Sequence, residues 1–547
     1  MYFTEEFTAP ERAVLNRFFT NTDKPVFALI NLPEVVKGAL FARYSRTPKS
    51  LRRLFLDEFY NQPETGVATI AEAMGGDDDA LQLERAEKLY ERVFSGYGDD
   101  SVAQLGGAHL ACEQASNLLT KVLERGRIAA YLEQSTRYIY YDQKLGENYR
   151  YLVPPEVKGS PLEAEYVDEI DRLFETYSEV VQVCKTHFEE KFPRQPGDSL
   201  GVWRSSIRAK ACDAARGLLP ASTTSNLGIF ATGQSYEMML LRMRAHPLAE
   251  AREYADMMLT ELRHVIPSFV KRVDVPDRGG VWSDYFANIR SEMEDITGRM
   301  QDKPADVPEV QLTEWDPDAE AKLAAAALYE YSDLPDSQLT RIAAAMPADE
   351  RERILKAYIG DRSNRRHHPG RGFERSFYRF DILSDFGSFR DLQRHRMLTI
   401  DWQRLSPTFG YSVPVAVEEN GLTGRWHDAM GRMTALHGKL SQVLGPDAAQ
   451  YAVPFAFRLR YYMQMNVREA FHLLELRTAQ QGHADYRRIC QEMHRLIAEQ
   501  AGHRVIASGM NYVDHNDYGE TGLERLEAER RSEQRRKNAG LSEDSGE

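Results

Sequence analysis

Residues 125–138 concentrate side chains that can bind an anion. Three arginines, one glutamate, one serine and two tyrosines fall within fourteen positions: Arg125, Arg127, Tyr131, Glu133, Ser135, Arg137 and Tyr138. A guanidinium holds two oxygens of a phosphate or carboxylate at once, and a nearby serine can add its hydroxyl and backbone N–H. The stretch therefore predicts a loop that binds an anionic ligand. The alternative is that the arginines only complement the negative end of a helix dipole.

A second basic cluster, Arg394-His395-Arg396, lies far downstream.

The composition, with 42% hydrophobic and 28% charged residues, is that of an ordinary globular protein. A net charge of -14 argues against a nucleic-acid binder, which needs a basic face. Local arginine clusters in an acidic protein are therefore interpreted as sites for a small anion.

Redox and targeting features indicate a cytoplasmic protein. The four cysteines lack metal-ligand spacing, so they predict buried thiols of a reducing compartment and neither a disulfide framework nor a metal site: Cys112, Cys184, Cys212 and Cys490. The start of the chain lacks the basic and apolar parts of a signal peptide. No apolar run is long enough to span a bilayer, so no membrane partner is expected.

Helices must position most of these residues. A helix is predicted over 116–124, leading directly into Arg125, whereas 108–114 fits a strand or a helix equally well. Four other segments have helical periodicity: 81–94, 162–192, 200–219 and 235–272. The composition of 96–101 predicts a turn.

At 547 residues the chain should divide into two or three domains. Prolines and acidic residues over 300–318 predict a linker between a first domain, 1–299, and a second, 319–518. Residues 519–547 are rich in Glu, Arg and Ser, which predicts a solvated helix continuing into a flexible, charged tail.

The chain also repeats itself. Short motifs of the first half recur in the same order in the second: Ala39–Ser45 with Ala327–Ser332, Arg125–Arg127 with Arg394–Arg396, Leu218–Pro220 with Ala452–Pro454, and Leu241–Arg242 with Leu476–Arg477. Each similarity is weak by itself. Their common order makes a duplicated domain the best single account.

These residues resemble the flavin-dependent thymidylate synthase family, in a tandem and diverged two-copy version. The family carries Arg-His-Arg, seven residues, then Ser-x-Arg, commonly followed by Tyr. The first half is similar through Arg125–Arg127, Ser135–Tyr138, Ala215–Pro220 and Leu241–Arg242, and the second through Arg394–Arg396, Asn466–Arg468 and Leu476–Arg477. Together the two matches span most of the chain.

The resemblance implies an α+β fold with two tandem related domains, each an antiparallel sheet packed with long helices. It also implies FAD as cofactor, dUMP as a small-molecule substrate, and methylenetetrahydrofolate and NADPH as co-substrates. Family members form homotetramers whose sites combine several subunits. A fused pair of domains is therefore expected to form a homodimer.

Residue roles follow from the same resemblance. Five residues are expected to bind the substrate: Glu133, Ser135, Arg137, Arg216 and Arg242. Of these, Ser135 and Arg242 are the expected catalytic residues, although no histidine base lies near Ser135 in sequence, which disfavours a covalent role. Seven residues are expected to bind the cofactor: Arg125, Arg127, Arg394, His395, Arg396, Asn466 and Arg468. The structural alternative is that the arginines form ordinary salt bridges with the abundant acids.

Departures from the family pattern divide the two halves. The first half has Gly126 for the family histidine and Ala231 and Gly233 for Asn-x-Arg, whereas the second has Arg404 for the serine and Gln450 where the first half has Arg216. The first half thus keeps the nucleotide-facing set, and the second keeps the flavin-facing set. We expect reductive methylation of dUMP at one composite site. The alternatives are a flavoenzyme acting on another pyrimidine nucleotide and a non-catalytic nucleotide-binding relative.

Overall fold

A computed structural model describes residues 5–45, 47–61, 104–518 and 522–538. The chain forms two compact units. As far as they are described, unit 1 holds residues 1–113, 122–133 and 226–302, and unit 2 holds 114–121, 134–225 and 303–547. The helix predicted over 81–94 and the turn predicted over 96–101 lie outside the described residues.

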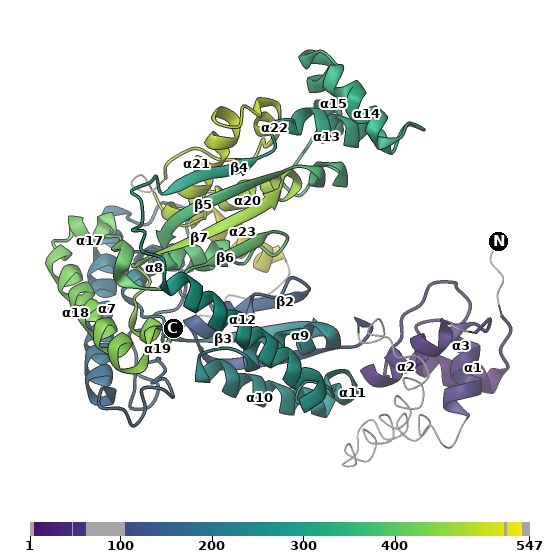
Figure 1. Ribbon diagram of the computed structural model, residues 1–547, viewed down its shortest axis with the longest axis horizontal. Coiled ribbons are helices and arrows are strands. Elements are labelled where there is room, and N and C mark those ends of the chain that lie inside the picture. Colours follow the sequence, from purple (N-terminus) through teal and green to yellow (C-terminus); the bar gives the residue numbers. More distant parts are fainter. Residues whose placement is uncertain (1–4, 46, 62–103, 519–521, 539–547) are drawn as a thin grey trace. The chain divides into compact units, whose positions relative to one another are not determined.

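The fold is α+β, as predicted, with two antiparallel sheets in a repeated order of elements (Figure 1). The first copy contains β1 (Gly107–Ser116), α6 (Asn117–Leu123), β2 (Ala129–Glu133), α7 (Glu163–Lys191), α8 (Leu200–Ala215), η4 (Arg216–Leu218), β3 (Thr224–Thr232), α9 (Gly233–Arg244) and α10 (Ala249–Val265). The second copy contains β5 (Phe377–Asp385), α16 (Phe386–Leu392), β6 (Thr399–Trp402), α18 (Thr423–Leu444), α19 (Pro446–Ala449), η8 (Gln450–Ala452), β7 (Arg458–Asn466), α20 (Val467–Arg477) and α21 (Ala484–Glu499).

The two sheets have the same strand order. The first is β1-β3-β2, and the second is β4-β5-β7-β6, so β1, β3 and β2 correspond to β5, β7 and β6. The second sheet adds β4 (Val310–Trp315) at its edge beside β5. A shared strand order together with a shared sequence of elements supports the duplication inferred from the repeated motifs.

The remaining elements connect or flank these copies. In unit 1 they are α1 (Ala9–Phe18), α2 (Glu34–Tyr44), α3 (Leu51–Leu54), η1 (Phe55–Tyr60), α11 (Pro267–Val270), η5 (Pro276–Gly280) and α12 (Val281–Gly298). In unit 2 they are α13 (Ala319–Tyr329), α14 (Asp336–Ala345), α15 (Ala348–Ile359), η6 (Arg371–Arg375), η7 (Pro407–Phe409), α17 (Val415–Glu419), α22 (Arg504–Gly509) and α23 (Leu526–Asn538).

Strand alternation builds the core of the second sheet. Strands β5 and β7 pair from Phe377 opposite Asn466 to Asp385 opposite Arg458. Every second residue of each strand is buried, namely Tyr378, Phe380, Ile382 and Ser384 of β5 and Leu459, Tyr461, Met463 and Met465 of β7. Burying each large apolar side chain contributes about 1.5–3 kcal/mol, so this sheet is a firm base for the helices that leave it.

The last residue of each of these strands begins the next helix. The Asp385 side chain accepts the backbone N–H of Ser388 at 2.8 Å, and the Asn466 side chain accepts that of Glu469 at 2.8 Å. Such side-chain caps satisfy N–H groups that have no partner inside the helix. They set the start of α16 and of α20, and thereby place the residues that those helices carry.

The Leu219-Pro220 segment of the first copy lies against the Val453-Pro454 segment of the second copy, within unit 2. Pro220 and Pro454 form an antiparallel bridge. Four backbone hydrogen bonds of 2.9–3.0 Å flank it in two matching pairs: Ala221 N–H to Val453 O with Phe455 N–H to Leu219 O, and Ser222 N–H to Tyr451 O with Ala456 N–H to Gly217 O. Each pair is related by the same exchange of copies. This is the arrangement of a local twofold axis, at which equivalent segments meet.

Several predicted elements are confirmed and one needs correction. Segment 108–114, which periodicity left undecided, belongs to strand β1, and segment 235–272 forms α9, α10 and α11. Strand β4 occupies 310–315, inside the predicted linker 300–318, because its backbone pairs with β5. The predicted solvated helix near the C-terminus is α23, whose Arg530 donates to Asp198 at 2.6 and 3.0 Å.

The predicted domains and the compact units also differ. Residues 134–225 belong to the first sequence copy, yet they group with 303–547 in unit 2. The helices of this stretch pack on second-copy elements; Arg432 of α18, for example, pairs with Glu169 of α7 at 2.6 Å. Unit 2 therefore contains residues of both copies.

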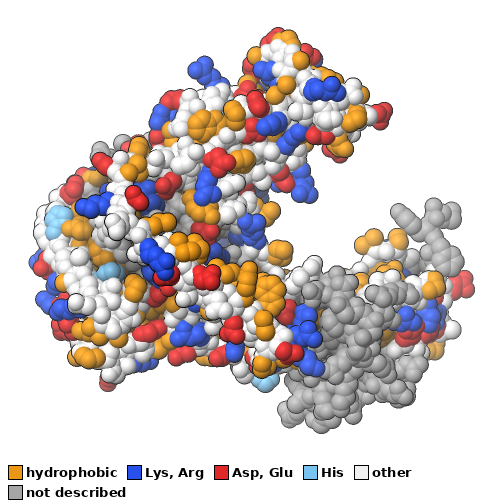
Figure 2. Space-filling model, in the orientation of Figure 1, with side chains coloured by type: hydrophobic (Ala, Val, Ile, Leu, Met, Phe, Trp, Pro, Cys, Tyr) orange, Lys and Arg blue, Asp and Glu red, His pale blue; other side chains and the backbone are white. Residues whose placement is uncertain are grey.

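The four cysteines are buried and free, as predicted. No helix within the described ranges combines the length and the apolar character that a bilayer crossing requires. On the face drawn in Figure 2, acidic and basic side chains are interspersed.

Candidate nucleotide-binding site

Unit 2 contains a cavity of about 220 Å³ whose wall is dominated by arginines. We call it the arginine cavity. The charged and hydroxyl side chains that line it are Ser135, Thr136, Arg137, Tyr138, Arg216, Arg390, Asp391, Arg394, Arg477, Tyr486 and Arg525. Ser135, Arg137 and Arg216 come from the first copy, and Arg394 and Arg477 come from the second. The cavity thus brings together, in one chain, motifs that lie more than 250 positions apart.

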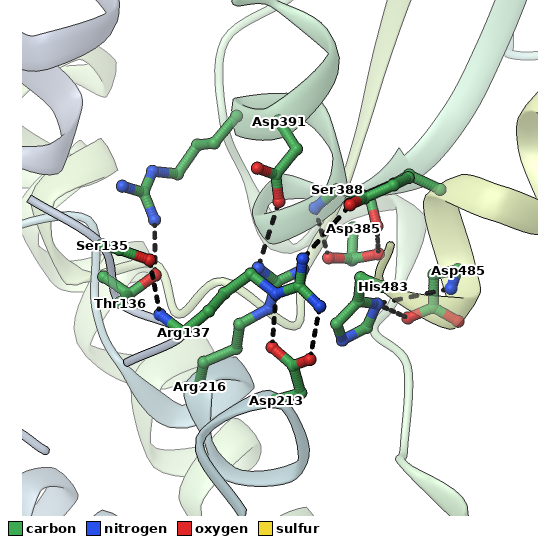
Figure 3. Close-up of polar contacts among 12 residues, drawn as sticks. Ser135, Thr136, Arg137, Asp213, Arg216, Asp385, Ser388, Asp391, His483 and Asp485 are labelled. Carbon is green, nitrogen blue, oxygen red and sulfur yellow. Dashed lines mark hydrogen bonds and ion pairs between the residues drawn. The ribbon is translucent and has the colours of Figure 1, made fainter. Parts of the chain in front are cut away.

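Arg137 is fixed by a buried ion pair. Its guanidinium donates twice to Asp213, from Nε to Oδ1 at 2.7 Å and from Nη2 to Oδ2 at 2.6 Å, and Nη1 donates to the Tyr486 hydroxyl at 3.2 Å. The Arg137 backbone N–H donates to Ser135 Oγ at 3.2 Å (Figure 3). Burial alone would raise the pKa of Asp213, but the attached guanidinium holds the pKa below its ordinary value. Arg137 therefore has a fixed position at the cavity wall.

Asp391 gathers the other arginines around one carboxylate. Arg216 Nη1 donates to Asp391 Oδ2 at 3.3 Å, and Arg394 and Arg477 place Nη1 at 3.9 and 4.0 Å from Oδ1. Burial would raise the pKa of Asp391, yet Arg394, Arg216 and Arg137 hold this pKa below its ordinary value. Even so, six arginines line the cavity against this one lining carboxylate. This excess positive charge favours an anionic ligand.

A hydrogen-bonded chain leads from the cavity to buried His395. Arg477 Nε donates to His395 Nε2 at 2.9 Å, and His395 Nδ1 lies 3.0 Å from a carboxylate oxygen of Glu469. Burial lowers the pKa of His395 to about 4, against the opposing effect of Glu469. A neutral ring that donates from Nδ1 and accepts at Nε2 satisfies both neighbours. Positioning of Arg477 therefore depends on an uncharged His395.

His395, Glu469 and His472 could also hold a metal ion, since their ligand atoms all lie within 4.8 Å of one another. However, both imidazoles already face the Glu469 carboxylate, His472 Nδ1 at 3.3 Å, and the Arg477 guanidinium lies against His395. The positive charge of the Arg477 guanidinium, whose Nε lies 2.9 Å from His395 Nε2, would repel a metal cation bound by these residues. The three residues are better explained as a hydrogen-bonded network than as a metal site.

Acid should weaken the fold through His395. The pKa of this group is about 4 in the folded chain and about 6.5 when unfolded, so the unfolded chain takes up the proton first. Stability is therefore lost as pH falls from about 6.5 to about 4, by about 2 kcal/mol at pH 5. Chemical denaturation at pH 7 and pH 5 should show a smaller loss for His395→Asn, which keeps a donor toward Glu469, than for the unchanged protein. His264→Asn, at an exposed position, should lose as much as the unchanged protein; equal losses for all three proteins would contradict this role of His395.

Two predicted cofactor residues have other partners and do not line the arginine cavity. The Asn466 side-chain oxygen caps α20, and Arg468 Nε donates to the Pro369 carbonyl at 2.9 Å, with Glu374 at 3.8 Å from Nη1. Arg396 follows His395 at a partly exposed position and is not part of the cavity wall either. A role for these three residues in cofactor binding stays a prediction.

Four further predicted residues belong to unit 1, namely Arg125, Arg127, Glu133 and Arg242. Burial and the nearby charge of Arg125 both lower the pKa of Arg242. The two arginines therefore act on each other electrostatically. Beside them, Gly126 stands where the family pattern has a histidine. A Cβ added there would lie 2.6 Å from the Tyr131 hydroxyl and 3.9 Å from Arg242 Nη2. Tyr131 thus occupies space that a histidine side chain would need.

Sequence reasoning missed four charged residues around the arginine cavity: Asp213, Arg390, Asp391 and Arg525. One signal was available for the two acids. Asp213 precedes Arg216 by three positions, and Asp391 precedes Arg394 by three, a spacing at which helical side chains become neighbours. Nothing local indicated Arg390, which donates to Thr136 at 3.2 Å across 254 positions.

Comparison with known proteins identifies similar sequences over most of the chain. The sequence model of the family described as thymidylate synthase complementing protein (Thy1) matches twice, at residues 56–268 and 311–501. A protein of Chlamydia muridarum named UPF0159 protein is 39% identical over 530 residues, covering 96% of this chain and 98% of its own length. The flavin-dependent thymidylate synthase of Clostridium tetani is 28% identical over 223 residues, 39% of this chain and 83% of its own.

Among solved structures, the UMP/dUMP methylase PolB of Streptomyces cacaoi, bound with 5-Br dUMP, overlaps 38% of this chain and 97% of its own. The TM-score is 0.29 at 15% identity.

Proposed function

Because the chain belongs to the thymidylate synthase complementing protein family, matched over two separate stretches, we propose that it is a flavin-dependent enzyme that converts dUMP to dTMP. Methylenetetrahydrofolate would donate the methylene group and NADPH would reduce the flavin. The proposal draws on the similarity to a flavin-dependent thymidylate synthase over 223 residues. The observation that carries it is the arginine cavity, which joins Ser135 and Arg137 of one copy to Arg394 and Arg477 of the other.

The nucleotide phosphate would lie in the arginine cavity. The Arg137 guanidinium is already paired with Asp213, so it would contribute a fixed positive charge to the binding of the phosphate. The Arg394 side chain is not enclosed in this way, since 38% of it is accessible. Arg216 has one buried nitrogen, Nη2, without a hydrogen-bond partner in the described structure. An unused buried donor beside a cavity is costly unless a ligand meets it. Ser135, at the wall of the same cavity, would act by positioning the nucleotide and by electrostatics. A catalytic role for Arg242, which belongs to unit 1, stays a prediction.

FAD would be held mainly by second-copy residues, Arg394, His395, Arg396, Asn466 and Arg468. One observation fits a polar ligand there. His368 lies 5.5 Å from the ring of His472, and its buried Nδ1 has no hydrogen-bond partner in the described structure. Reduced flavin would supply the hydride. The arginines would bind the pyrophosphate of FAD through charge-assisted hydrogen bonds. Neutral His395 would accept a hydrogen bond from Arg477 and so hold the Arg477 guanidinium in position.

The phosphate assignment predicts a large difference between dUMP and deoxyuridine. Loss of two charge-assisted hydrogen bonds costs about 3 kcal/mol, so deoxyuridine should bind about a hundredfold more weakly in calorimetric titrations. Arg137→Ala should reduce that ratio by about tenfold, while Arg194→Ala, at an exposed position outside the cavity, should preserve it. Equal affinity of the unchanged protein for both ligands would rule out a phosphate site in this cavity.

The reaction is tested separately from binding. Flavin absorbance of the purified protein should be present and should decrease in Arg394→Ala. The gene should then support growth of a thymidine auxotroph. Flavin and dUMP binding without growth would indicate another pyrimidine reaction, and absence of flavin would indicate a non-catalytic nucleotide-binding protein. A dimer of chains is expected by light scattering, because two fused copies replace two subunits of the family assembly.

A further inference from the structure

Residues 522–538, which include α23, are anchored beside the arginine cavity. We call them the C-terminal arm. Lys210 of α8 donates to Glu524 at 2.7 Å, in an ion pair whose side chains are 10% and 18% accessible. Arg530 donates twice to Asp198, just ahead of α8, at 2.6 and 3.0 Å. These two ion pairs hold the arm on α8, the helix that also carries the acid of the buried ion pair at the cavity wall.

Arg525 lies between these two anchors and lines the arginine cavity. Its Cζ is 4.0 Å from the centre of the Tyr138 ring. Its Nε is buried and has no hydrogen-bond partner within the described ranges. An aromatic ring attracts a cation through the ring face, and this attraction supplies no acceptor for Nε. The contact with Tyr138 therefore orients the guanidinium but leaves a buried donor without an acceptor.

Arg525 also differs from four other arginines of this cavity in its charge partners. A carboxylate oxygen lies 2.6 Å from Arg137, 3.3 Å from Arg216, 3.9 Å from Arg394 and 4.0 Å from Arg477. Among the described residues, Arg525 has no carboxylate within 4.0 Å. Burial and the charge of Arg137 lower the pKa of Arg525 to about 10. A buried guanidinium without a counter-charge is costly, which indicates that an anion completes this part of the wall.

We propose that Arg525 is a phosphate-binding residue of the arginine cavity, supplied by the C-terminal arm. Its guanidinium would donate charge-assisted hydrogen bonds to the nucleotide phosphate. The inference rests on the proposed function for the identity of the anion. It adds a contact from outside the family motifs, because the second stretch that matches the family model ends at residue 501. Docking of the arm and binding of the phosphate would then strengthen each other, since coupling between two binding events is reciprocal.

Titration calorimetry of the full chain with dUMP and with deoxyuridine tests this contact. Arg525→Gln should bind dUMP about tenfold more weakly, as expected for the loss of a hydrogen bond between charged groups, and should bind deoxyuridine as the unchanged protein does. A purely structural role would weaken both ligands equally, and retained deoxyuridine binding shows that the variant is folded. Arg525→Lys keeps the charge and should recover part of the dUMP affinity. Arg531→Gln, at an exposed position of the same helix, should change neither affinity.

Limited proteolysis tests the coupling between the arm and the phosphate. By linkage, saturating dUMP should slow tryptic cleavage within α23 by about the same tenfold factor, whereas deoxyuridine should not. The cleavage products are identified by mass spectrometry. Protection by dUMP should disappear in Arg525→Gln and persist in Arg531→Gln. Protection that persists in Arg525→Gln would contradict the coupling.

The outcomes separate this inference from the proposed function. If the unchanged protein prefers dUMP and Arg525→Gln keeps that preference, the role of Arg525 is wrong and the proposed function stands. Loss of flavin absorbance in Arg525→Gln with the preference kept would assign the residue to the cofactor and would also overturn the inference. Equal binding of dUMP and deoxyuridine by the unchanged protein would overturn both. A preference that depends on Arg525, without growth of the thymidine auxotroph, would overturn the reaction and support the contact.

Discussion

Replacing Arg137 by alanine is expected to lower the free energy of unfolding by about 3 kcal/mol or more. Asp213 would lose both hydrogen bonds from Arg137 and stay in a mostly buried position, with 20% of its side chain accessible. A buried carboxylate without its partner bears the full cost of leaving water. Urea denaturation at pH 7 measures the loss. Binding of dUMP should weaken at the same time, because the cavity loses one of its fixed charges.

The double variant Arg137→Ala/Asp213→Ala separates the two effects. Removing both charges should recover more than 1 kcal/mol of the lost stability, while nucleotide binding stays weak. Arg194→Ala, at an exposed position, should change the free energy of unfolding by less than about 0.5 kcal/mol. A double variant no more stable than Arg137→Ala would mean that the pair is not coupled as the geometry indicates. The lowered pKa of Asp213 adds a pH check: its contribution is present above the ordinary aspartate pKa and is lost as pH falls below it.

Removing the charge of Arg362 should have an effect of the same size or greater. Arg362 and Glu475 are 1% exposed at both side chains and form two parallel hydrogen bonds, of 2.6 and 2.5 Å. Arg362 also donates to the Gly509 carbonyl at 3.0 Å and thereby ties α22 to α20. Arg362→Met keeps the volume of the side chain but leaves the Glu475 carboxylate buried without a cation. The expected loss is about 3–5 kcal/mol, measured by chemical denaturation.

The companion variant is Arg362→Met/Glu475→Leu. Well-packed apolar residues in place of a buried ion pair are often neutral or stabilising, so most of the loss should be recovered. Arg371→Met is the surface control, since its pair with Glu374 leaves 85% of the arginine side chain accessible and should contribute no more than about 1 kcal/mol. A small effect of Arg362→Met alone would show that Glu475 gains water or takes up a proton in the variant.

The duplication and the family could be inferred from sequence because both depend on short motifs that follow one another in a fixed order along the chain. The Arg-x-Arg motif, the Leu-Pro or Val-Pro segment and the Leu-Arg pair recur in the same order, and the interval from the proline to the arginine of the Leu-Arg pair is nearly constant, at 22 residues (220 to 242) and 23 residues (454 to 477). Helical periodicity likewise gave α7 and α8 within a few residues. Short-range patterns of this kind are read directly from neighbouring positions.

Pairing over long distances could not be read in this way. Segment 108–114 had no decisive period, and only its backbone hydrogen bonds to β3 make it the strand β1. The segment of strand β4 lies among prolines and acids, which indicated a linker. It is a strand because its backbone pairs with the edge of β5. Strand propensity depends on the partner strand, which a single segment does not specify.

The sequence by itself therefore determined that this is a two-copy member of its family with a basic motif at Arg394, and it predicted an anion-binding loop near Ser135 and Arg137. Only the tertiary structure decided which charges meet. Asp213 takes Arg137, Asp391 gathers arginines from both copies, and Asp385 and Arg216 converge on Gly387. The physical reason is that a buried charge is stable only beside its counter-charge, and in this chain the matching groups lie up to hundreds of residues apart.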